Sequence, residues 1–314
     1  MNGTILLTGG TRGLGYATLE ALLRADPSRH VILPARNLTA ARAVTARLTA
    51  KYESKVSGST NLHLVECDLG DLASIRKAAA EIGELLDQPG IPPLQVLAAN
   101  AGVQRWREYA TTADGFEVTF GTNLLGHYLL VRLLTERISR PGRIVLVSSS
   151  THWGDFRHTW GMVAAPRWDA AEALARPAES ARVASRAAAT SAYSTSKLAL
   201  IYLTHELARR LPEGVDVYSY NPGLIPGTGL AREAPGITMF LSRTVFQSVR
   251  LLPGAVGART SGAELAETLT GPPPAPTGAY LDRGHPVDSS PESYDPDRER
   301  QLWLDSAHLV EIEP

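Results

Sequence analysis

Short, uninterrupted apolar runs alternate with longer segments of helical periodicity through the first half of this chain, and this alternation constrains the fold more than any other feature. The apolar runs lie at Thr4–Leu7, His30–Leu33, Leu62–Val65, Leu94–Ala98 and Arg143–Val147. The segments with helical spacing are Leu14–Leu23, Leu38–Lys51, Ile75–Leu86 and approximately Gly115–Ile138. Continuously apolar strands separated by helices are typical of a parallel sheet with helices on both faces. We therefore predict an α/β fold with a doubly wound parallel sheet, which binds ligands at the carboxyl ends of its strands.

The second half continues this pattern and adds segments to it. Residues 151–190 are rich in Trp, Ala, Arg and Pro without a sustained period, and we expect an insertion with short helices there. The expected elements that follow are a helix at Ser191–Leu211, a strand at Val215–Tyr220, a Pro-rich loop at residues 272–276, a strand at Gly278–Leu281 and a helix near Asp295–Val310. We expect a single Rossmann-type domain over residues 1–314, with a C-terminal strand and helix in residues 271–314.

The charge balance is nearly neutral, with 31 Lys and Arg against 32 Asp and Glu and a formal net charge of −1. No overall field favours nucleic acid or an anionic membrane, so small molecules are the expected partners. Cys67 is the only cysteine, which excludes an intrachain disulfide, and no metal site is expected. The first expected strand begins close to Met1, and no apolar run reaches the roughly 18 residues of a membrane span. We therefore expect a cytoplasmic protein without an integral membrane segment, and the preference for Arg over Lys indicates a GC-rich bacterial genome.

The first expected strand ends in a glycine-rich turn, Thr8-Gly9-Gly10-Thr11-Arg12-Gly13-Leu14-Gly15, that leads into a helix. Glycines in this context let the backbone approach a pyrophosphate at the helix N-terminus. A purely structural turn is the alternative, and the flanking strand and helix favour the phosphate-binding interpretation. The spacing resembles the Thr-Gly-x-x-x-Gly-x-Gly turn of short-chain dehydrogenases. The residues expected to contact a dinucleotide here are Gly9, Thr11, Arg12, Gly13, Leu14 and Gly15.

Further matches to that family follow in its order along nearly the whole chain. They are Asp68-Leu69, Asn100-Ala101-Gly102, Asn123, Ser149, Tyr193-Ser194-Thr195-Ser196-Lys197 and Pro222-Gly223. The resemblance implies that Asp68 and Leu69 lie at the adenine and that Asn100, Ala101 and Gly102 lie beside the ribose. It also implies that Pro222 and Gly223 contact the cofactor and that Thr228 contacts its nicotinamide.

Tyr193 and Lys197 are four residues apart on an expected helix, so a phenol and an ammonium group share one face. A nearby cation favours the phenolate and brings a phenol, whose free pKa is about 10, toward a useful acid/base range. The resemblance implies that Tyr193 donates a proton to the developing alkoxide, that Ser149 hydrogen-bonds the substrate oxygen and that Lys197 holds the nicotinamide ribose. It further implies that Asn123 anchors a water leading toward Lys197.

The family pattern decides which of three serines is catalytic, and the usual behaviour of lone histidines decides how two of them are treated. Among the consecutive residues Ser148, Ser149 and Ser150, the pattern selects Ser149 as catalytic, with Ser150 as the alternative. Contacts of His127 and His152 with substrate or solvent channels stay open, but neither histidine is assigned to catalysis, because a lone histidine is more often a satisfied structural group.

The end of the second expected strand discriminates between cofactors. It reads Leu33-Pro34-Ala35-Arg36-Asn37, with no acidic residue where a ribose 2′-hydroxyl would be bound. Arg36 suits a 2′-phosphate instead, and Arg12 in the glycine turn offers a second guanidinium. Two solvated arginines are the alternative. We predict NADP(H) as the cofactor.

Within the family, the segments Ala113–Glu117, Asn123–His127 and Pro222–Leu230 are most similar to the retinol dehydrogenase and protochlorophyllide oxidoreductase branch. The resemblance implies an NADPH-dependent oxidoreductase of bacterial secondary metabolism that acts on a bulky, lipophilic or aromatic carbonyl, alcohol or conjugated double bond. A non-redox outcome such as dehydration or isomerisation, a cofactor-sensing regulator and a homodimer stay open. We expect residues 151–190 and 227–253 to form a substrate lid, with a dimer interface or a membrane-resting patch as alternatives.

Overall fold

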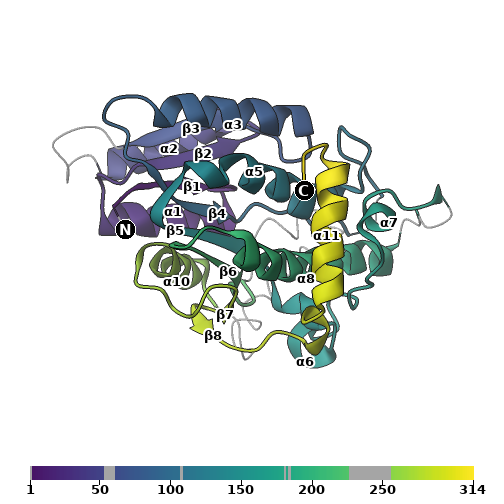
Figure 1. Ribbon diagram of the computed structural model, residues 1–314. Helices are drawn as coiled ribbons and strands as arrows, with labels where there is room; N and C mark the ends of the chain where they lie inside the picture. The colour runs from purple at the N-terminus through teal and green to yellow at the C-terminus, as the bar shows by residue number, and fades with distance from the viewer. Residues whose placement is uncertain (1, 53–60, 107–108, 180–181, 183–184, 226–255) are drawn as a thin grey trace.

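The computed structural model describes residues 2–52, 61–106, 109–179, 182, 185–225 and 256–314 (Figure 1). Its strands are β1 (Thr4–Leu7), β2 (Val31–Ala35), β3 (Leu62–Glu66), β4 (Leu94–Ala99), β5 (Ile138–Val147), β6 (Val215–Asn221), β7 (Tyr280–Asp282) and β8 (His285–Pro286). They form one sheet in the order β3-β2-β1-β4-β5-β6-β7-β8, parallel except for the last pair. The order reverses between β1 and β4, which is where such sheets bind ligands.

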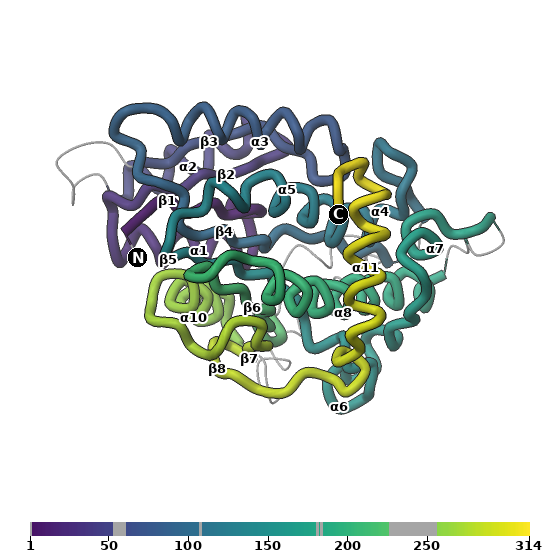
Figure 2. The backbone as a smooth tube through the Cα atoms, in the orientation of Figure 1, coloured from purple at the N-terminus to yellow at the C-terminus, as the bar shows by residue number. Residues whose placement is uncertain are grey.

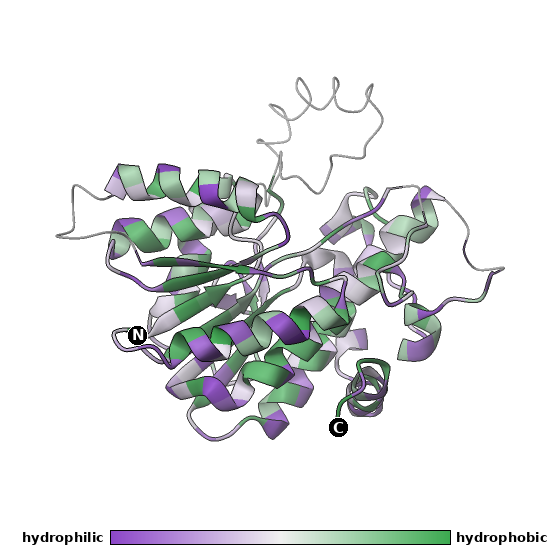
Figure 3. Ribbon diagram, turned by 90° about the horizontal axis from the view of Figure 1, so that it is seen from above, coloured by the Kyte–Doolittle hydropathy of each residue, from purple (hydrophilic) through white to green (hydrophobic). Residues whose placement is uncertain are grey.

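Helices cover both faces of this sheet because the strands are apolar on both faces. One face packs against α1 (Gly13–Ala25), α2 (Leu38–Tyr52) and α10 (Ala258–Thr270), and the other against α3 (Leu72–Leu86), α5 (Gly126–Leu134) and α8 (Arg186–Arg210). Along β1, Leu6 belongs to one apolar core, while Ile5 and Leu7 belong to the other. Figure 3 shows the apolar strands between helices whose outer surfaces are more polar.

The helix expected over Gly115–Ile138 is shorter and changes its winding. It consists of α4 (Val118–Phe120), the π-helical turn η2 (Gly121–Leu125), α5 and the 3-10 turn η3 (Thr135–Arg137). The helix cannot begin at Gly115, which has a φ of +80°, and the Glu117 carboxylate caps its start by accepting from Phe120 N at 2.7 Å. Ile138 already pairs with Leu94 of β4 and therefore opens β5.

Helix α10 is absent from the elements that the sequence predicts. Its sequence, ARTSGAELAETLT, contains Thr, Ser and Gly residues that lower helix propensity, yet it packs closely on α1. A Cβ at Gly262 would lie 2.5 Å from Ala17, so the two helices cross at small residues.

The expected lid segment 227–253 and Thr228 lie outside the described residues.

The C-terminal segment differs in detail from its prediction. The strand expected at Gly278–Leu281 begins at Tyr280 and is followed by the short strand β8, the turn η7 (Pro291–Ser293) and α11 (Pro296–Leu309). Figure 2 shows α11 lying across α8. Tyr202 of α8 donates to Glu292 O at 2.7 Å, and His205 lies 2.7 Å from a carboxylate oxygen of Glu299.

The segment 151–190 contains short helical pieces in its described part. They are η4 (Ser150–Trp153), α6 (Phe156–Thr159) and α7 (Ala171–Ala175). Helix α8 begins at Arg186 rather than at Ser191, because the Ser185 hydroxyl caps it by accepting from Ala188 N at 3.1 Å.

Candidate active site

The glycine-rich turn joins β1 to α1 at the carboxyl edge of the sheet. Gly9 and Gly13 have φ of +68° and +54°, a region that glycine adopts without steric cost. A Cβ on Gly15 would lie 2.3 Å from the carbonyl oxygen of Gly9, so glycine is required for the turn to close on α1. Thr11 is half-buried and Arg12 is exposed at the N-cap, where its side chain makes no capping hydrogen bond. The first amides of α1 therefore face the turn without a side-chain cap, in the arrangement that receives an anion.

Thr8 ties this turn to the end of β4. Its Oγ1 accepts from the amides of Asn100 and Ala101, each at 2.9 Å, and its carbonyl oxygen accepts from Asn100 Nδ2 at 2.8 Å. A Cβ on Gly102, the residue after Ala101, would lie 3.7 Å from Lys197 Nζ. The predicted ribose-contacting residues therefore lie between the glycine turn and Lys197.

The predicted adenine end lies at the carboxyl ends of β2 and β3. Arg36 Nη1 is 3.9 Å from Asp68 Oδ2, and the two side chains are 73% and 40% exposed. The other carboxylate oxygen of Asp68 accepts from Gly70 N at 2.9 Å. Leu14 and Leu69 bury their side chains in the two apolar cores. Their side chains are therefore occupied by packing, so the predicted ligand contacts at these two positions fall to the backbone.

The predicted catalytic groups meet at the carboxyl end of β5. Tyr193 and Lys197 are 7% and 3% exposed on successive turns of α8. Lys197 Nζ is 5.5 Å from the centre of the phenol ring and donates to the carbonyl oxygen of Val147 at 2.8 Å. The Ser149 hydroxyl lies close enough to the hydroxyl of Tyr193 to lower the pKa of that phenol. The fold thus brings Ser149, Tyr193 and Lys197 together from two elements.

The three consecutive serines point to three different partners. Ser148 Oγ donates to the carbonyl oxygen of Lys197 at 2.8 Å, and Ser150 Oγ donates to the carbonyl oxygen of His158 at 3.4 Å. Ser149 Oγ accepts from Thr151 N at 3.3 Å, which leaves its hydrogen for donation toward the phenol. Of the three serines, Ser149 is the one beside Tyr193.

Burial controls the ionisation of the two central groups. It lowers the pKa of Lys197 from 10.5 to about 7. It raises the pKa of Tyr193 from 10.0 to about 12, against the opposing effect of the Ser149 hydrogen bond. The lowering of the phenol pKa that the sequence suggested is therefore outweighed by desolvation. At neutral pH the phenol carries its proton, as a proton donor requires.

Asn123 lies fully buried in the π-helical turn η2. Its Oδ1 accepts from Val103 N at 2.8 Å, and its Nδ2 donates to Val103 O and to Ser196 Oγ, each at 3.0 Å. These bonds hold the loop after β4 against α8, one residue before Lys197. A Cβ on Gly102 would lie 3.4 Å from Asn123 Oδ1, so Asn123 and Lys197 flank the same glycine.

Both unassigned histidines are fully buried and hydrogen-bonded. Burial lowers the pKa of each ring to about 4, so both are neutral at physiological pH. His152 Nδ1 lies 2.7 Å from the carbonyl oxygen of Ser149, and its Nε2 accepts from Ser290 N at 3.1 Å. His127 Nδ1 lies 3.0 Å from the carbonyl oxygen of Asn123. The four-residue spacing of Asn123 and His127 on an expected helix is the sequence signal for the contact between these two residues.

Asn221, which the sequence analysis did not select, organises the end of β6. Its Oδ1 accepts from Ser150 N at 3.1 Å and from Gly223 N at 3.3 Å, and its Nδ2 donates to Asp282 at 2.7 Å. The carbonyl oxygen of Pro222 accepts a hydrogen bond from α10 at 2.8 Å. Pro222 and Gly223 are thereby held next to the serine turn. The signal in the sequence that could have identified Asn221 was its position as a polar residue at the end of an apolar strand.

Hydroxyl side chains of α8 hold part of the 151–190 segment. The bonds are Ala164 N to Thr190 Oγ1 (3.1 Å), Ser191 Oγ to Ala165 O (2.8 Å), Ser194 Oγ to Ala164 O (2.7 Å) and Arg167 N to Thr195 Oγ1 (2.9 Å). Ser194 and Thr195 directly follow Tyr193. Residues 164–167 are therefore fixed to the helix that carries the candidate acid.

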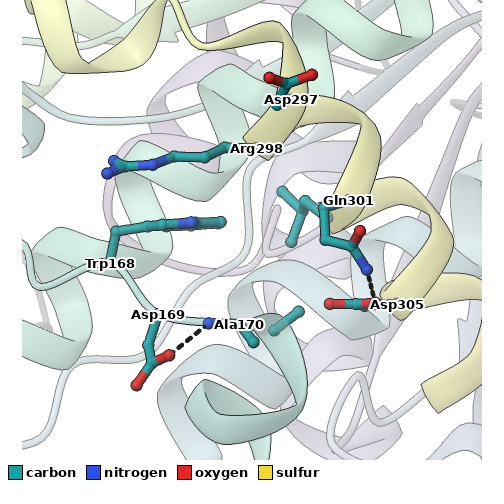
Figure 4. A pocket seen from close by; sticks show the side chains of 9 residues that line it. Trp168, Asp169, Ala170, Asp297, Arg298, Gln301 and Asp305 are labelled. Carbon is teal, nitrogen blue, oxygen red and sulfur yellow. Dashed lines mark hydrogen bonds between the residues drawn. The ribbon is translucent and has the colours of Figure 1, made fainter.

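A hollow of about 340 Å³ lies elsewhere, between Trp168–Ala171 and α11 (Figure 4). Its lining residues are Trp168, Asp169, Ala170, Ala171, Asp297, Arg298, Gln301, Leu302 and Asp305. Figure 4 shows the Arg298 side chain extending alongside the indole of Trp168. None of the predicted site residues lines this hollow, so it is separate from the candidate active site.

Comparisons with known proteins identify the family of the chain. Residues 3–158 match the family model for short chain dehydrogenase. Human retinol dehydrogenase 13 is 32% identical over 324 residues, which cover 99% of this chain and 85% of the relative. The chain therefore belongs to the short-chain dehydrogenase/reductase family of oxidoreductases. The chloroplastic protochlorophyllide reductase of Pisum sativum is 31% identical, over 98% of this chain and 78% of its own length. Within the family, the chain belongs to the branch of these two relatives.

Solved structures share the fold. An uncharacterised protein from Mycobacterium paratuberculosis superposes with a TM-score of 0.68 at 25% identity, over 99% of this chain and 94% of that chain. An NADPH-bound carbonyl reductase from chicken fatty liver superposes with a TM-score of 0.61 at 21% identity, over 91% and 98% of the two chains. The Rossmann-type fold predicted from the sequence is thereby confirmed.

Across the part of the chain that the structure describes, no helix has both the length and the apolar composition needed to cross a bilayer.

Proposed function

We propose that this protein transfers hydride between NADP(H) and a bulky, lipophilic or aromatic small molecule, either a carbonyl/alcohol pair or a conjugated double bond, with Tyr193 as general acid and base. The observation that carries the proposal is that the Ser149 and Tyr193 hydroxyls lie close together, beside buried Lys197, at the carboxyl end of β5. Ligands of doubly wound sheets bind at this edge.

Each of these side chains has a distinct task in the reduction of a carbonyl. Tyr193, protonated at neutral pH, donates its hydrogen to the substrate oxygen as negative charge develops there. Ser149, whose oxygen is occupied by the Thr151 amide, donates its own hydrogen to the same atom. The Lys197 ammonium group holds the ribose hydroxyls next to the nicotinamide. The cofactor, when bound, supplies or accepts the hydride.

The residues present fit a dinucleotide that carries a 2′-phosphate. The bare backbone of Gly9, Gly13 and Gly15 accommodates a pyrophosphate, since side chains there would be strained or would meet the chain itself. Arg36 is exposed at the end of β2, where an NAD-selective enzyme would carry a carboxylate. The NADPH in the chicken carbonyl reductase of the same fold is consistent with this choice.

Replacing both Arg12 and Arg36 with Ala tests the cofactor preference. Charged hydrogen bonds contribute about 1.5–3 kcal/mol each, so we expect the KM for NADPH to rise at least about tenfold. The KM for NADH should change far less, because NADH lacks the 2′-phosphate. Equal effects on both cofactors would show that the two arginines do not bind that phosphate.

Exposed aromatic side chains in the segment that follows Ser149 support a lipophilic substrate. Phe156 and Trp160 are exposed at α6 and pack edge to face, with ring centres 6.3 Å apart. Together with the retinol dehydrogenase relative, this surface favours a large apolar ligand. We extend the proposal to the described part of residues 151–190 as a segment that covers such a ligand.

Turnover of NADPH against a panel of bulky ketones and enones tests the reaction itself. We expect Tyr193→Phe to bind NADPH normally and to lose at least about 100-fold in kcat, the contribution of a general acid. Tyr202→Phe is the matched control, because it removes a buried phenol hydroxyl on the same helix that faces Glu292. Near wild-type activity of Tyr193→Phe would remove Tyr193 from the mechanism. Substrate conversion without NADPH consumption would indicate a non-redox enzyme, and NADPH binding without any conversion would indicate a cofactor-sensing regulator.

A further inference from the structure

His127 on α5 links parts of the site that are far apart in the sequence. Its ring is fully buried, with Nδ1 3.0 Å from the carbonyl oxygen of Asn123 and Nε2 3.0 Å from Thr8 Oγ1. Thr8 Oγ1 also accepts from the amides of Asn100 and Ala101 at 2.9 Å. One chain of hydrogen bonds therefore runs from the π-helical turn, through the imidazole, to the ends of β1 and β4.

The partners determine where the ring hydrogen lies. The carbonyl oxygen of Asn123 can only accept, so Nδ1 carries the hydrogen. Burial keeps the ring neutral by lowering its pKa to about 4, and the charged group that acts on it is Lys197 of α8. Nε2 is therefore an acceptor, and the Thr8 hydroxyl donates to it. The alternative acceptor for Thr8, the carbonyl oxygen of Ala98, is farther away at 3.3 Å.

This assignment satisfies every group in the chain of bonds. With its hydrogen directed at Nε2, the Thr8 oxygen keeps two lone pairs for the amides of Asn100 and Ala101. The opposite tautomer would set a bare Nδ1 against the carbonyl oxygen of Asn123, and it would bring a third N–H to Thr8. A buried mismatch of that kind is costly, so the tautomer is fixed by its surroundings.

We propose that His127 is a positioning residue with two separable tasks. Through Nδ1 it fixes the backbone of Asn123, whose side chain lies beside Gly102 as Lys197 does, and so orders the surroundings of the proton-transferring groups. Through Nε2 and Thr8 it fixes the strand ends that bind the dinucleotide. The first task rests on the proposed function, whereas the second requires only that the protein binds NADPH.

Two variants separate the tasks because each keeps one end of the ring. Asparagine places an amide nitrogen near the position of Nδ1, so His127→Asn retains the bond to Asn123 and loses the bond to Thr8. Glutamine places its oxygen near the position of Nε2, so His127→Gln retains the bond to Thr8 and loses the bond to Asn123. Thr8→Val removes the hydroxyl that donates to Nε2. Thr204→Val is the control for losing a buried hydroxyl, since among the described residues Thr204 Oγ1 bonds only to Leu200 O of its own helix, at 2.8 Å.

We expect opposite kinetic signatures from the two histidine variants. His127→Gln should lower kcat about tenfold or more while the Kd for NADPH stays within about twofold of wild type, because misplaced groups cost rate rather than cofactor affinity. His127→Asn and Thr8→Val should raise the Kd for NADPH about tenfold, with a smaller effect on kcat. Melting temperatures of all variants and of Thr204→Val measure any general loss of stability.

The proposal is overturned if both histidine variants change kcat and Kd by the same factors, or only in proportion to their loss of melting temperature. It is also overturned if ¹⁵N spectra of histidine-labelled protein place the hydrogen of His127 on Nε2. The spectra and the NADPH titrations need no turnover. A protein that binds NADPH but converts no substrate would refute the proposed function and leave these two readouts to decide the role of His127.

Discussion

Replacing Lys197 by methionine should abolish turnover and yet stabilise the folded protein at low pH. The ammonium group is 3% exposed and donates to the carbonyl oxygen of Val147. Burial lowers its pKa from 10.5 to about 7, which corresponds to about 5 kcal/mol at about 1.4 kcal/mol per pKa unit. That free energy opposes folding in full below about pH 7, where the buried lysine is charged, and opposes it less at higher pH.

The sign of the pH dependence follows from the lowered pKa of the folded state. Between pH 7 and 10.5 the unfolded chain binds more protons than the folded protein, so the stability of the wild type rises with pH through this window. Below about pH 7 the full cost of the buried charge is present. Methionine removes that cost but leaves the buried carbonyl of Val147 without its donor, a loss of about 1–3 kcal/mol. We therefore expect Lys197→Met to be about 2–4 kcal/mol more stable than wild type at pH 6.

Urea unfolding followed by tryptophan fluorescence, at pH 6 and pH 9 without NADPH, measures this difference. By pH 9 the wild type should have regained about 3 kcal/mol, so the two proteins should be about equally stable. Lys77→Met is the control, because Lys77 is exposed on α3 and its replacement should give the same small difference at both pH values. A Lys197→Met advantage that is unchanged between pH 6 and pH 9 would refute the lowered pKa.

Two further pairs of variants test the packing and the serine assignment. Gly262→Ala should destabilise the protein by about 1–2 kcal/mol, because overpacking against Ala17 exceeds the gain in helix propensity. Gly83→Ala in α3, where nothing lies within 4 Å of the new Cβ, should stabilise the protein by about 0.5–1 kcal/mol in the same urea assay. If both variants changed the free energy of unfolding in the same direction, α1 and α10 would have room to separate. Ser149→Ala should lower kcat for NADPH oxidation by about 100-fold or more, as expected for losing a hydrogen-bond donor to the reacting oxygen. Ser150→Ala should stay within several-fold of wild type, and equal losses in both serine variants would contradict the assignment of Ser149.

The alternation of apolar and amphipathic segments predicted the sheet because buried strands and helices have different periods. The boundaries that failed have local causes. Pro141 and Gly142 are typical of a turn, so the sequence did not predict that β5 begins as early as Ile138. Helix α10 was missed because its apolar face is short: Leu265 and Leu269 enter the core, but the turn before them buries the small residues Ser261 and Gly262 against α1.

The candidate site was predictable where its chemistry lies in one short segment. Tyr193 and Lys197 share a helix face by their spacing alone. The link between Thr8 and His127 joins residues 119 positions apart, and only the parallel order of β1 and β4 brings them together. The pKa of the Tyr193 phenol depends on how completely the fold excludes water, which spacing along the chain does not report.

The docking of α11 across α5 and α8 also bears on how the chain reaches this state. Tyr128 of α5 donates to the carbonyl oxygen of Trp303, 175 residues later, and Tyr202 of α8 donates to Glu292, 90 residues later. Contacts of such long range form slowly, and chains fold from the N-terminus during synthesis. The apolar outer surfaces of α5 and α8 therefore stay uncovered until residues 291–309 have left the ribosome. The yield of active protein on expression or refolding is then governed by how fast this segment docks relative to aggregation.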